Sequence, residues 1–221
     1  MKNLNQDLRF ERKWVFANNY LDIYNKLHKS KFGFRNMYPD RYVNSIYFDD
    51  FSYSSVRENL DGSNKKMKIR LRWYGKNNFI LKNPRLEFKI KQNFMNYKII
   101  NEMPNLNNLN IKNFEEMQLV NKAVNQFYDK KILNPVSTTN YIRSYFISSN
   151  NHIRSTVDIN FKVSKFFNNF YSPIFKKFSK IILEMKYKKE FDDYIMKNLN
   201  DISSRYSRNS KYIDSMINYY Y

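Results

Sequence analysis

Several segments of the chain alternate strictly between apolar and polar residues, a period of two that predicts β-strands with one apolar and one polar face. Residues 67–74 are the clearest example, because Lys68, Arg70 and Arg72 fall on one face and apolar residues fill the other. Residues 85–91 repeat this pattern. The same alternation predicts strands at residues 9–14, 44–49, 141–147, 153–159 and 180–187.

Longer stretches between these strands have the three-and-four spacing of amphipathic helices. Residues 17–28 place Ile23 and Leu27 on one helical face. Residues 111–133 contain neither Gly nor Pro and precede Pro135, which predicts a long helix that ends before this proline. Shorter helices are predicted at residues 51–60, 191–200 and 213–220, loops at 105–113 and 175–180, and a hairpin turn at Asn150 and Asn151.

This order of elements predicts an α+β fold in which an antiparallel sheet dominates. For one strand, the simplest interpretation of a charged face is a sheet with one face in water. The charged faces recur in strand after strand, and if the sheet closes into a barrel with these rows inside and helices packed outside, the interior becomes a charged channel. The rows would gather Arg9, Lys13, Lys68, Arg70, Arg72, Lys89, Lys91, Arg143, Arg154 and Lys186, with Glu11, Glu87, Asp158 and Glu184 among them.

The charge balance of the chain favours an anionic partner. Of the 221 residues, 39 are Lys or Arg and 20 are Asp or Glu, which gives a net charge of +19. Cations packed together inside a barrel repel one another strongly unless an anion lies between them. Arg and Lys bind phosphate oxygens, and carboxylates supply the oxygen ligands that Mg²⁺ or Mn²⁺ prefers. The pattern therefore predicts a site for a metal-bound triphosphate.

Composition excludes several other kinds of site. There is no Cys, so disulfides, thiolate metal sites and Cys nucleophiles are absent. With His28 and His152 as the two histidines, an all-His zinc site is excluded as well, and neither histidine lies on a charged row. We expect a single domain over residues 1–221, without a signal peptide or transmembrane segment, in the cytoplasm, and a membrane partner is left open.

The motifs resemble the VTC domain, the polyphosphate polymerase branch of the triphosphate tunnel metalloenzymes. The resemblance covers residues 8–215 and follows the family's order of motifs. The sister CYTH branch begins with Glu-x-Glu-x-Lys, whereas Arg9 takes the first carboxylate position here, as the VTC pattern prefers. The matching segments are RFERKW from Arg9, SIYFD from Ser45, KIRLRWYG from Lys68, LEFK from Leu86, YIR from Tyr141, RSTVD from Arg154, ILEMKY from Ile182 and SKY from Ser210.

The resemblance implies a closed antiparallel β-barrel with helices packed outside. Its tunnel would bind ATP by the triphosphate and transfer the γ-phosphoryl group to a growing inorganic polyphosphate chain, with Mn²⁺ or Mg²⁺ as cofactor. Trp14 replaces the family's usual tyrosine, and Arg208 stands where a second lysine is usual. We assign a catalytic, phosphate-holding role to Lys13, Arg70, Arg72, Lys89, Arg143, Arg154 and Lys211, substrate binding to Arg9, Lys68, Lys91, Lys186 and Arg208, and metal binding to Glu184, Glu11, Glu87 and Asp158.

Two other functions remain open from the sequence. The same tunnel can hydrolyse inorganic or nucleoside triphosphates when water replaces the acceptor phosphate. A chain with this charge and 18% aromatic residues can also be a non-enzymatic module that binds polyanions or nucleic acid. We rank this binding module below the enzymes and expect no specific nucleic acid partner, because the aromatic residues of the strands lie on the apolar faces.

Overall fold

The structure, a computed structural model, describes residues 9–17, 19–92, 95–199, 207 and 209–217. It divides into two compact units. Three strands run through both units, so neither unit is a continuous piece of chain. Unit 1 comprises Met1–Arg41, Ile142–Phe161 and Ser179–Asn209, and unit 2 comprises Tyr42–Tyr141, Lys162–Phe178 and Ser210–Tyr221.

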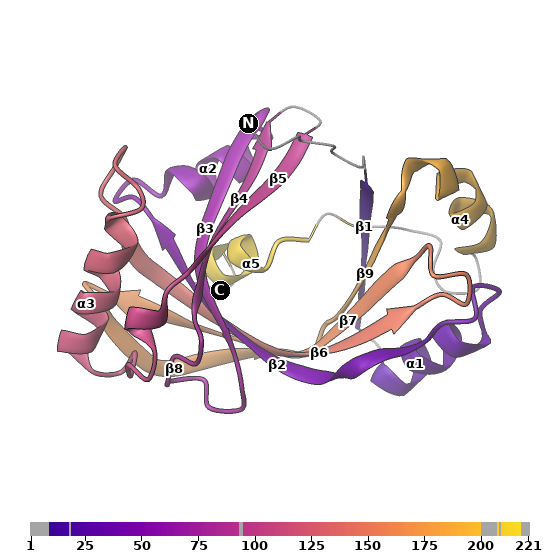
Figure 1. The fold of residues 1–221 in the computed structure, drawn as a ribbon, viewed down its shortest axis with the longest axis horizontal. Coiled ribbons are helices and arrows are strands. Elements are labelled where there is room, and N and C mark those ends of the chain that lie inside the picture. The colour runs from indigo at the N-terminus through magenta and orange to yellow at the C-terminus, as the bar shows by residue number, and fades with distance from the viewer. Residues whose placement is uncertain (1–8, 18, 93–94, 200–206, 208, 218–221) are drawn as a thin grey trace. The chain divides into compact units, whose positions relative to one another are not determined.

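The described strands pair in the order β1-β9-β7-β6-β2-β3-β4-β5, and β8 pairs with β7. Figure 1 shows the elements with these labels. The strands are β1 (Arg9–Phe16), β2 (Arg35–Asp49), β3 (Lys65–Tyr74), β4 (Arg85–Gln92), β5 (Met95–Glu102), β6 (Asn134–Ile147), β7 (Arg154–Phe167), β8 (Phe170–Phe178) and β9 (Ile181–Lys188).

The sheet is not closed into a barrel, so the prediction of a closed barrel is wrong, while the antiparallel α+β fold is confirmed. Within the described ranges, β1 and β5 stand at the two ends of the pairing order and are not paired with each other. The physical reason is that a period of two fixes which residues share a face. Whether a sheet closes into a barrel depends on the number, tilt and stagger of its strands, and the period of two gives no information on these.

Unit 1 has its own apolar core beneath β1, β9 and the first part of β7. The helix α1 (Tyr20–Lys29) begins at Asn19, whose side chain accepts a hydrogen bond from the backbone of Leu21, and it buries Ile23 and Leu27. These residues pack with Trp14 and Leu183 from the strands. The short helix η2 (Lys189–Phe191) and α4 (Asp192–Asn198) follow β9 in this unit.

Unit 2 buries the apolar faces of β3 and β4 under a helix. The helix α3 (Phe114–Asn125) begins at Asn113, whose side chain accepts from the backbone of Glu116. Its buried residues Met117, Val120 and Val124 belong to one core with Leu71 and Trp73 of β3. The remaining helices of this unit are α2 (Ser54–Leu60), η1 (Pro104–Leu106) and α5 (Lys211–Ile217).

The helix α3 ends at Asn125, eight residues before the predicted end at Leu133. The side chain of Asn125 explains this end, because its amide donates to the carbonyl of Leu133 at 2.9 Å and its oxygen accepts from the same residue's backbone at 2.8 Å. These two bonds hold the returning chain against the last helical turn.

Two strands were not predicted from the sequence. The strand β5 exposes both Ile99 and Ile100, and β8 exposes both Ile174 and Phe175, so neither strand alternates between an apolar and a polar face. The predicted loop at residues 175–180 is thus partly strand β8, which tolerates Pro173 because prolines are found in edge strands. Within the described ranges, no helix combines the length and the hydropathy needed to cross a bilayer.

Candidate functional site: two clusters of ion pairs

The charged residues predicted for the site lie in two groups, one in each unit. Each group is built by neighbouring strands whose polar faces carry the charges. We name them by unit. The unit 1 cluster is Glu11, Lys13, Arg143, Asp158, Glu184 and Lys186, and the unit 2 cluster is Lys68, Arg70, Arg72, Glu87, Lys98 and Lys211 with Tyr47 and Tyr141.

Glu87 is the centre of the unit 2 cluster and is 3% exposed. Its Oε2 lies 2.6 Å from both Nε and Nη2 of Arg70 and 3.8 Å from Nη1 of Arg72, and its Oε1 accepts from Nζ of Lys98 at 2.5 Å. The antiparallel register explains these contacts. Arg70 stands opposite Glu87, and Lys98 lies two residues before the residue of β5 that pairs with Glu87, which places it on the same face.

The three neighbouring cations keep the carboxyl of Glu87 ionised. Burial alone would raise the pKa of this carboxyl, but Arg70, Arg72 and Lys98 lower the pKa to about 2. Burial would also lower the pKa of Arg70, and Tyr47 and Glu87 raise it instead. Burial holds the pKa of Lys98 below its ordinary value. One carboxylate therefore faces three cationic side chains, and the cluster carries excess positive charge.

Two tyrosines and a serine orient the arginines. Nη1 of Arg70 donates to the hydroxyl of Tyr47 at 3.4 Å. Nη2 of Arg72 donates to the hydroxyl of Tyr141 at 3.3 Å, and its Nε donates to Oγ of Ser45 at 3.2 Å. These bonds fix both guanidinium planes before any ligand binds, which reduces the entropy lost on binding.

Lys211 at the start of α5 and Ser210 just before it contact residues of the unit 2 cluster. Nζ of Lys211 lies 4.7 Å from the centre of the Tyr141 ring, and Nζ of Lys68 donates to Oγ of Ser210 at 2.9 Å. The helix is held by Tyr212, whose ring stacks on Tyr47 with 4.8 Å between centroids.

The hydroxyl of Tyr212 donates to Oδ2 of Asp49 at 2.5 Å. Asp49 is buried and also accepts hydrogen bonds from the backbone of Ser55 and Val56 at the start of α2. This carboxylate therefore ties α5 and α2 to the end of β2, and burial together with Asp49 raises the pKa of Tyr212.

The unit 1 cluster contains a square of two carboxylates and two lysines. Nζ of Lys13 lies 2.8 Å from Glu11 and 3.4 Å from Glu184, and Nζ of Lys186 lies 3.4 Å from Glu11 and 3.0 Å from Glu184. The register of β1 and β9 produces this square, because Lys13 stands opposite Glu184 and Glu11 opposite Lys186. Burial would lower the pKa of Lys13, but Glu184 and Glu11 raise it.

A second ion pair in unit 1 joins β6 to β7. Nε of Arg143 donates to Oδ1 of Asp158 at 2.6 Å, and its Nη2 donates to Oδ2 at 2.7 Å, a two-bond contact that fixes both side chains. Asp158 is 1% exposed. Arg154 is exposed and stands opposite Lys186 in the pairing of β7 with β9.

The remaining predicted site residues lie at the margins of these clusters or outside the description. Lys89 stands between Lys68 and Lys98 in the register of β3, β4 and β5. Lys91 is exposed near the end of β4. The backbone of Arg9 begins β1, but its side chain and the whole of Arg208 lie outside the described residues. The roles assigned to all these residues stay predictions.

The carboxylates of the unit 1 square are of the type that binds Mg²⁺ or Mn²⁺. Such ions usually take one or two carboxylates together with phosphate oxygens. Glu11 and Glu184 both contact the same pair of lysines, which compete with a metal ion for the carboxylate oxygens, and their assignment as ligands stays a prediction. Glu87 and Asp158 have arginine partners, and their assignment as ligands stays a prediction. In the described part of the chain, no group of three or more His, Asp or Glu side chains could hold a metal by itself.

Sequence reasoning missed four polar residues of unit 2. Lys98 was missed because β5 does not alternate, and Tyr47 and Tyr141 because aromatic residues of the strands were assigned to the core. Lys165 was missed as well. It is buried in β7, donates to the carbonyl of Met216 at 3.5 Å, and has a pKa that burial lowers to about 8. The one signal in the sequence that could have identified Tyr47 and Tyr141 is that both lie in strands beside polar residues.

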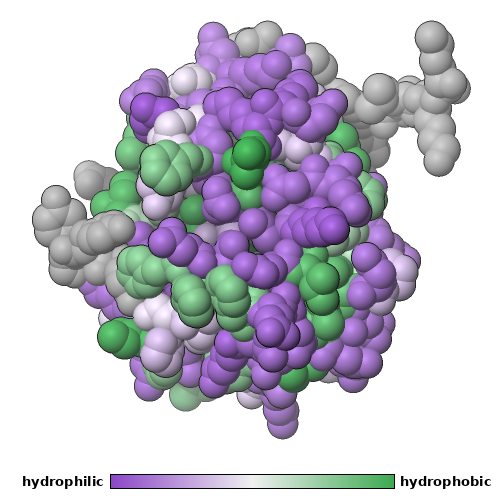
Figure 2. Space-filling view, turned by 90° about the vertical axis from the view of Figure 1, so that its left-hand side faces the viewer, coloured by the Kyte–Doolittle hydropathy of each residue, from purple (hydrophilic) through white to green (hydrophobic). Residues whose placement is uncertain are grey.

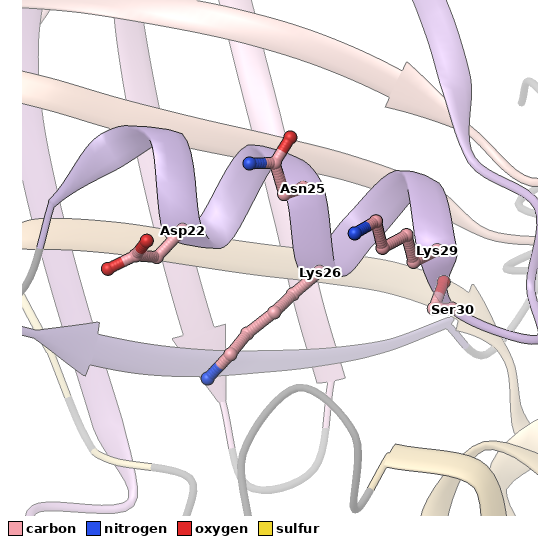
Figure 3. A pocket seen from close by; sticks show the side chains of 5 residues that line it. All are labelled: Asp22, Asn25, Lys26, Lys29 and Ser30. Carbon is pink, nitrogen blue, oxygen red and sulfur yellow. The ribbon is translucent and has the colours of Figure 1, made fainter.

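A hollow of about 420 Å³ beside α1 is not part of either cluster. Its lining residues come from this one helix and its C-terminal end, and Figure 3 shows their side chains leaving the helix in different directions. None of them belongs to a charged strand row, so this hollow offers no converging groups for a ligand. The lining residues are Asp22, Asn25, Lys26, Lys29 and Ser30.

Comparisons with known proteins agree with this architecture. A family model described as VTC domain matches residues 8–220. No curated protein matches the chain. Among solved structures, a candidate adenylate cyclase from Vibrio parahaemolyticus has a TM-score of 0.55 at 10% identity, over 94% of this chain and 97% of that one. A candidate adenylate cyclase from Bacillus halodurans has a TM-score of 0.51 at 11% identity, over 95% and 98%. At such identities the likeness establishes a shared fold.

The charge of Glu87 should make stability depend on pH. The pKa of Glu87 is about 2 in the folded chain and about 4.3 when unfolded, so its charge stabilises the fold fully above pH 4.3, and this contribution is lost as pH falls toward 2. We expect Glu87→Gln to lower the free energy of unfolding by about 3 kcal/mol at pH 7, and by about half as much at pH 3. Urea unfolding at several pH values measures both.

The control is Glu102→Gln, because Glu102 is exposed and pairs with an exposed Arg85. This variant should follow the wild type at every pH. A difference between wild type and Glu87→Gln that stays constant from pH 7 to pH 3 would contradict the ionised, cation-bound state of Glu87.

The hydroxyl of Tyr212 should determine how firmly α5 is held. Tyr212→Phe keeps the stacked ring but removes the donor to Asp49, a bond to a charged group worth about 1.5–3 kcal/mol. We expect the backbone amides of residues 213–217 to exchange with deuterium at least tenfold faster, while those of β3 and β4 stay unchanged. Tyr194→Phe, at an exposed tyrosine of α4, is the matched control. Unchanged exchange in α5 would show that Asp49 does not anchor it.

Proposed function

The chain belongs to the VTC domain family, and from this premise we propose that it is a metal-dependent polyphosphate polymerase that uses ATP. The observation that supports this function best is the excess of positive charge in the unit 2 cluster, where Arg70, Arg72 and Lys98 share the single carboxylate of Glu87. Such a group is stabilised further by a multiply charged anion, and a triphosphate supplies one.

The geometry of the two arginines matches that of linked phosphate groups. A guanidinium presents paired N–H donors that match two oxygens of a phosphate, and Arg70 and Arg72 are held side by side on one face of β3 by their tyrosine partners. Lys68 and Lys211 add point charges from the neighbouring part of unit 2. In this proposal these side chains bind and orient the triphosphate and neutralise the charge that develops during transfer.

The proposed reaction needs no nucleophilic side chain. A terminal oxygen of the polyphosphate acceptor, already ionised, forms the new bond to the γ-phosphorus of ATP, the bond from that phosphorus to the β–γ bridging oxygen breaks, and ADP leaves with the electron pair. Positioning and electrostatics carry most of the catalysis in such a transfer. The absence of Cys from the sequence is consistent with this chemistry.

We assign Glu184 and Glu11 as the residues that would hold Mn²⁺ or Mg²⁺. The ion would supply charge neutralisation at the phosphate oxygens. Lys13 and Lys186 hold both carboxylates in place. Glu184 is the more buried of the two, so removing its charge should affect the site more than removing that of Glu11.

Two other reactions of ATP are the alternatives to polymerisation. Transfer of the γ-phosphoryl group to water would make the protein a triphosphatase of the same fold. The two structural relatives are named as candidate adenylate cyclases, and an adenylate cyclase attacks the α-phosphorus and releases pyrophosphate. The acceptor atom differs among the three reactions, and the cyclase reaction also breaks a different bond, so their products differ.

Incubation with ATP labelled at the γ-phosphate, or separately at the α-phosphate, distinguishes them. We expect a ladder of γ-labelled polyphosphate with Mn²⁺ or Mg²⁺ and α-labelled ADP as the other product, resolved by gel electrophoresis and thin-layer chromatography. Lys211→Met, which keeps the apolar stem, should raise the ATP concentration at half-maximal rate at least several-fold. Glu184→Gln should lower the maximal rate at least tenfold at every metal concentration.

The matched control for Lys211 is Lys197→Met, at an exposed lysine near the end of α4. This variant has the same net charge as Lys211→Met and should behave as wild type. Labelled orthophosphate without a ladder would establish a triphosphatase, and α-labelled cyclic AMP with pyrophosphate would establish a cyclase. Full activity in Glu184→Gln would contradict the metal assignment.

A further inference from the structure

A long segment of the chain carries positive charge without any acidic residue. Between Asp158 and Glu184 there are five lysines and no Asp or Glu. Most of this segment forms the hairpin of β7 and β8 in unit 2, and among the described strands β8 pairs with β7 only. The two site clusters do not include the lysines of β8, so the charge of this hairpin needs a separate explanation.

The same hairpin exposes large apolar side chains. Ile174 is 70% exposed and Phe167 is 56% exposed, and Phe170 and Phe175 are exposed as well. Phe170 keeps one ring face on Phe114 of α3, with 4.3 Å between centroids, so the hairpin is attached to the core, while no described strand pairs with the other edge of β8. Figure 2 shows the side of the molecule that carries α3, where hydrophobic side chains lie among hydrophilic ones.

Lysines flank the exposed rings. Nζ of Lys162 lies 5.5 Å and Nζ of Lys177 5.8 Å from the centre of the Phe175 ring, and Nζ of Lys176 lies 5.9 Å from that of Phe178. Phe175 and Phe178 thus each have a lysine beside the ring. We call this exposed part of the hairpin the β8 surface. It includes both faces of the strand, because Ile174 and Lys176 alternate with Phe175 and Lys177. Its residues are Lys162, Phe167, Phe170, Ile174, Phe175, Lys176 and Lys177.

We propose that the β8 surface binds an anionic lipid bilayer. The lysines match the charge of acidic headgroups, and the exposed Phe and Ile side chains can leave water by entering the boundary between headgroups and acyl chains. This inference does not depend on the reaction that the clusters catalyse. It describes attachment to a membrane surface through a strand hairpin, without a spanning helix.

The apolar residues favour a bilayer over other anions. A free polyphosphate or nucleic acid backbone is bound by lysines and gains nothing from Ile174. Nucleic acid bases stack on flat aromatic rings, whereas the most exposed side chain of this surface is aliphatic. An anionic bilayer is the partner that interacts with both the lysines and the exposed apolar side chains. Variants that remove only the apolar side chains therefore test the inference.

The test is sedimentation of the full chain with vesicles of phosphatidylcholine, with or without added phosphatidylserine. We expect binding to the vesicles that contain phosphatidylserine, and a loss of at least tenfold in the partition coefficient for the double variant Ile174→Ser with Phe175→Ser, which keeps the net charge. The double variant Lys176→Gln with Lys177→Gln should lose at least as much as the apolar variant at low salt.

The matched control is Lys26→Gln with Lys29→Gln, at two exposed lysines of α1, which removes the same charge elsewhere. Equal losses in the two lysine variants would overturn the proposal, because net charge alone would then explain binding. Unchanged vesicle binding in the apolar variant would overturn it too. So would binding of the wild type to single-stranded RNA or polyphosphate, if the apolar variant lost that binding as strongly as it lost binding to vesicles.

Thermal denaturation checks that each variant is folded, and Phe167→Ser alone serves as a second apolar variant should the double variant unfold. ATP turnover without vesicles should be the same in all these variants, because none of the changed residues lies in either cluster. Failure of lipid binding therefore leaves the proposed reaction unaffected, and failure of the reaction leaves this inference unaffected.

Discussion

The buried carboxylate of Glu87 is the interaction on which the arrangement of unit 2 depends. Without it, Arg70, Arg72 and Lys98 would place three positive charges on adjacent strands at reduced dielectric, which strongly destabilises a sheet. The carboxylate reaches all three only because the strands β3, β4 and β5 pair in this register. A shift of one residue would move the charged row to the opposite face, against the apolar core.

The two clusters differ in their balance of charge, and this difference suggests different tasks. In unit 1, two lysines face two carboxylates, and Arg143 is matched by Asp158. In unit 2, three cations face one carboxylate. Unit 1 thus offers carboxylate oxygens of the kind that bind divalent cations, and unit 2 offers positive charge for an anion.

The sequence predicted the charged rows because strict alternation determines which side chains share a face, and Arg70, Arg72 and Glu87 were identified in this way. It did not predict Lys98, because β5 exposes apolar side chains on both faces and shows no period of two. The end of α3 depended on the side chain of Asn125 binding residue 133, a tertiary contact that no local pattern contains. Closure of the sheet was wrongly expected because a period of two carries no information on how edge strands meet.

The central claim is that the excess charge around Glu87 binds a chain of linked phosphates. The most direct test is titration calorimetry of the metal-free protein with orthophosphate, pyrophosphate and tripolyphosphate at one ionic strength. The account predicts that affinity rises at least tenfold with each added phosphate, and that Arg72→Gln weakens tripolyphosphate far more than orthophosphate. Equally weak binding of all three anions, unchanged in that variant, would contradict it.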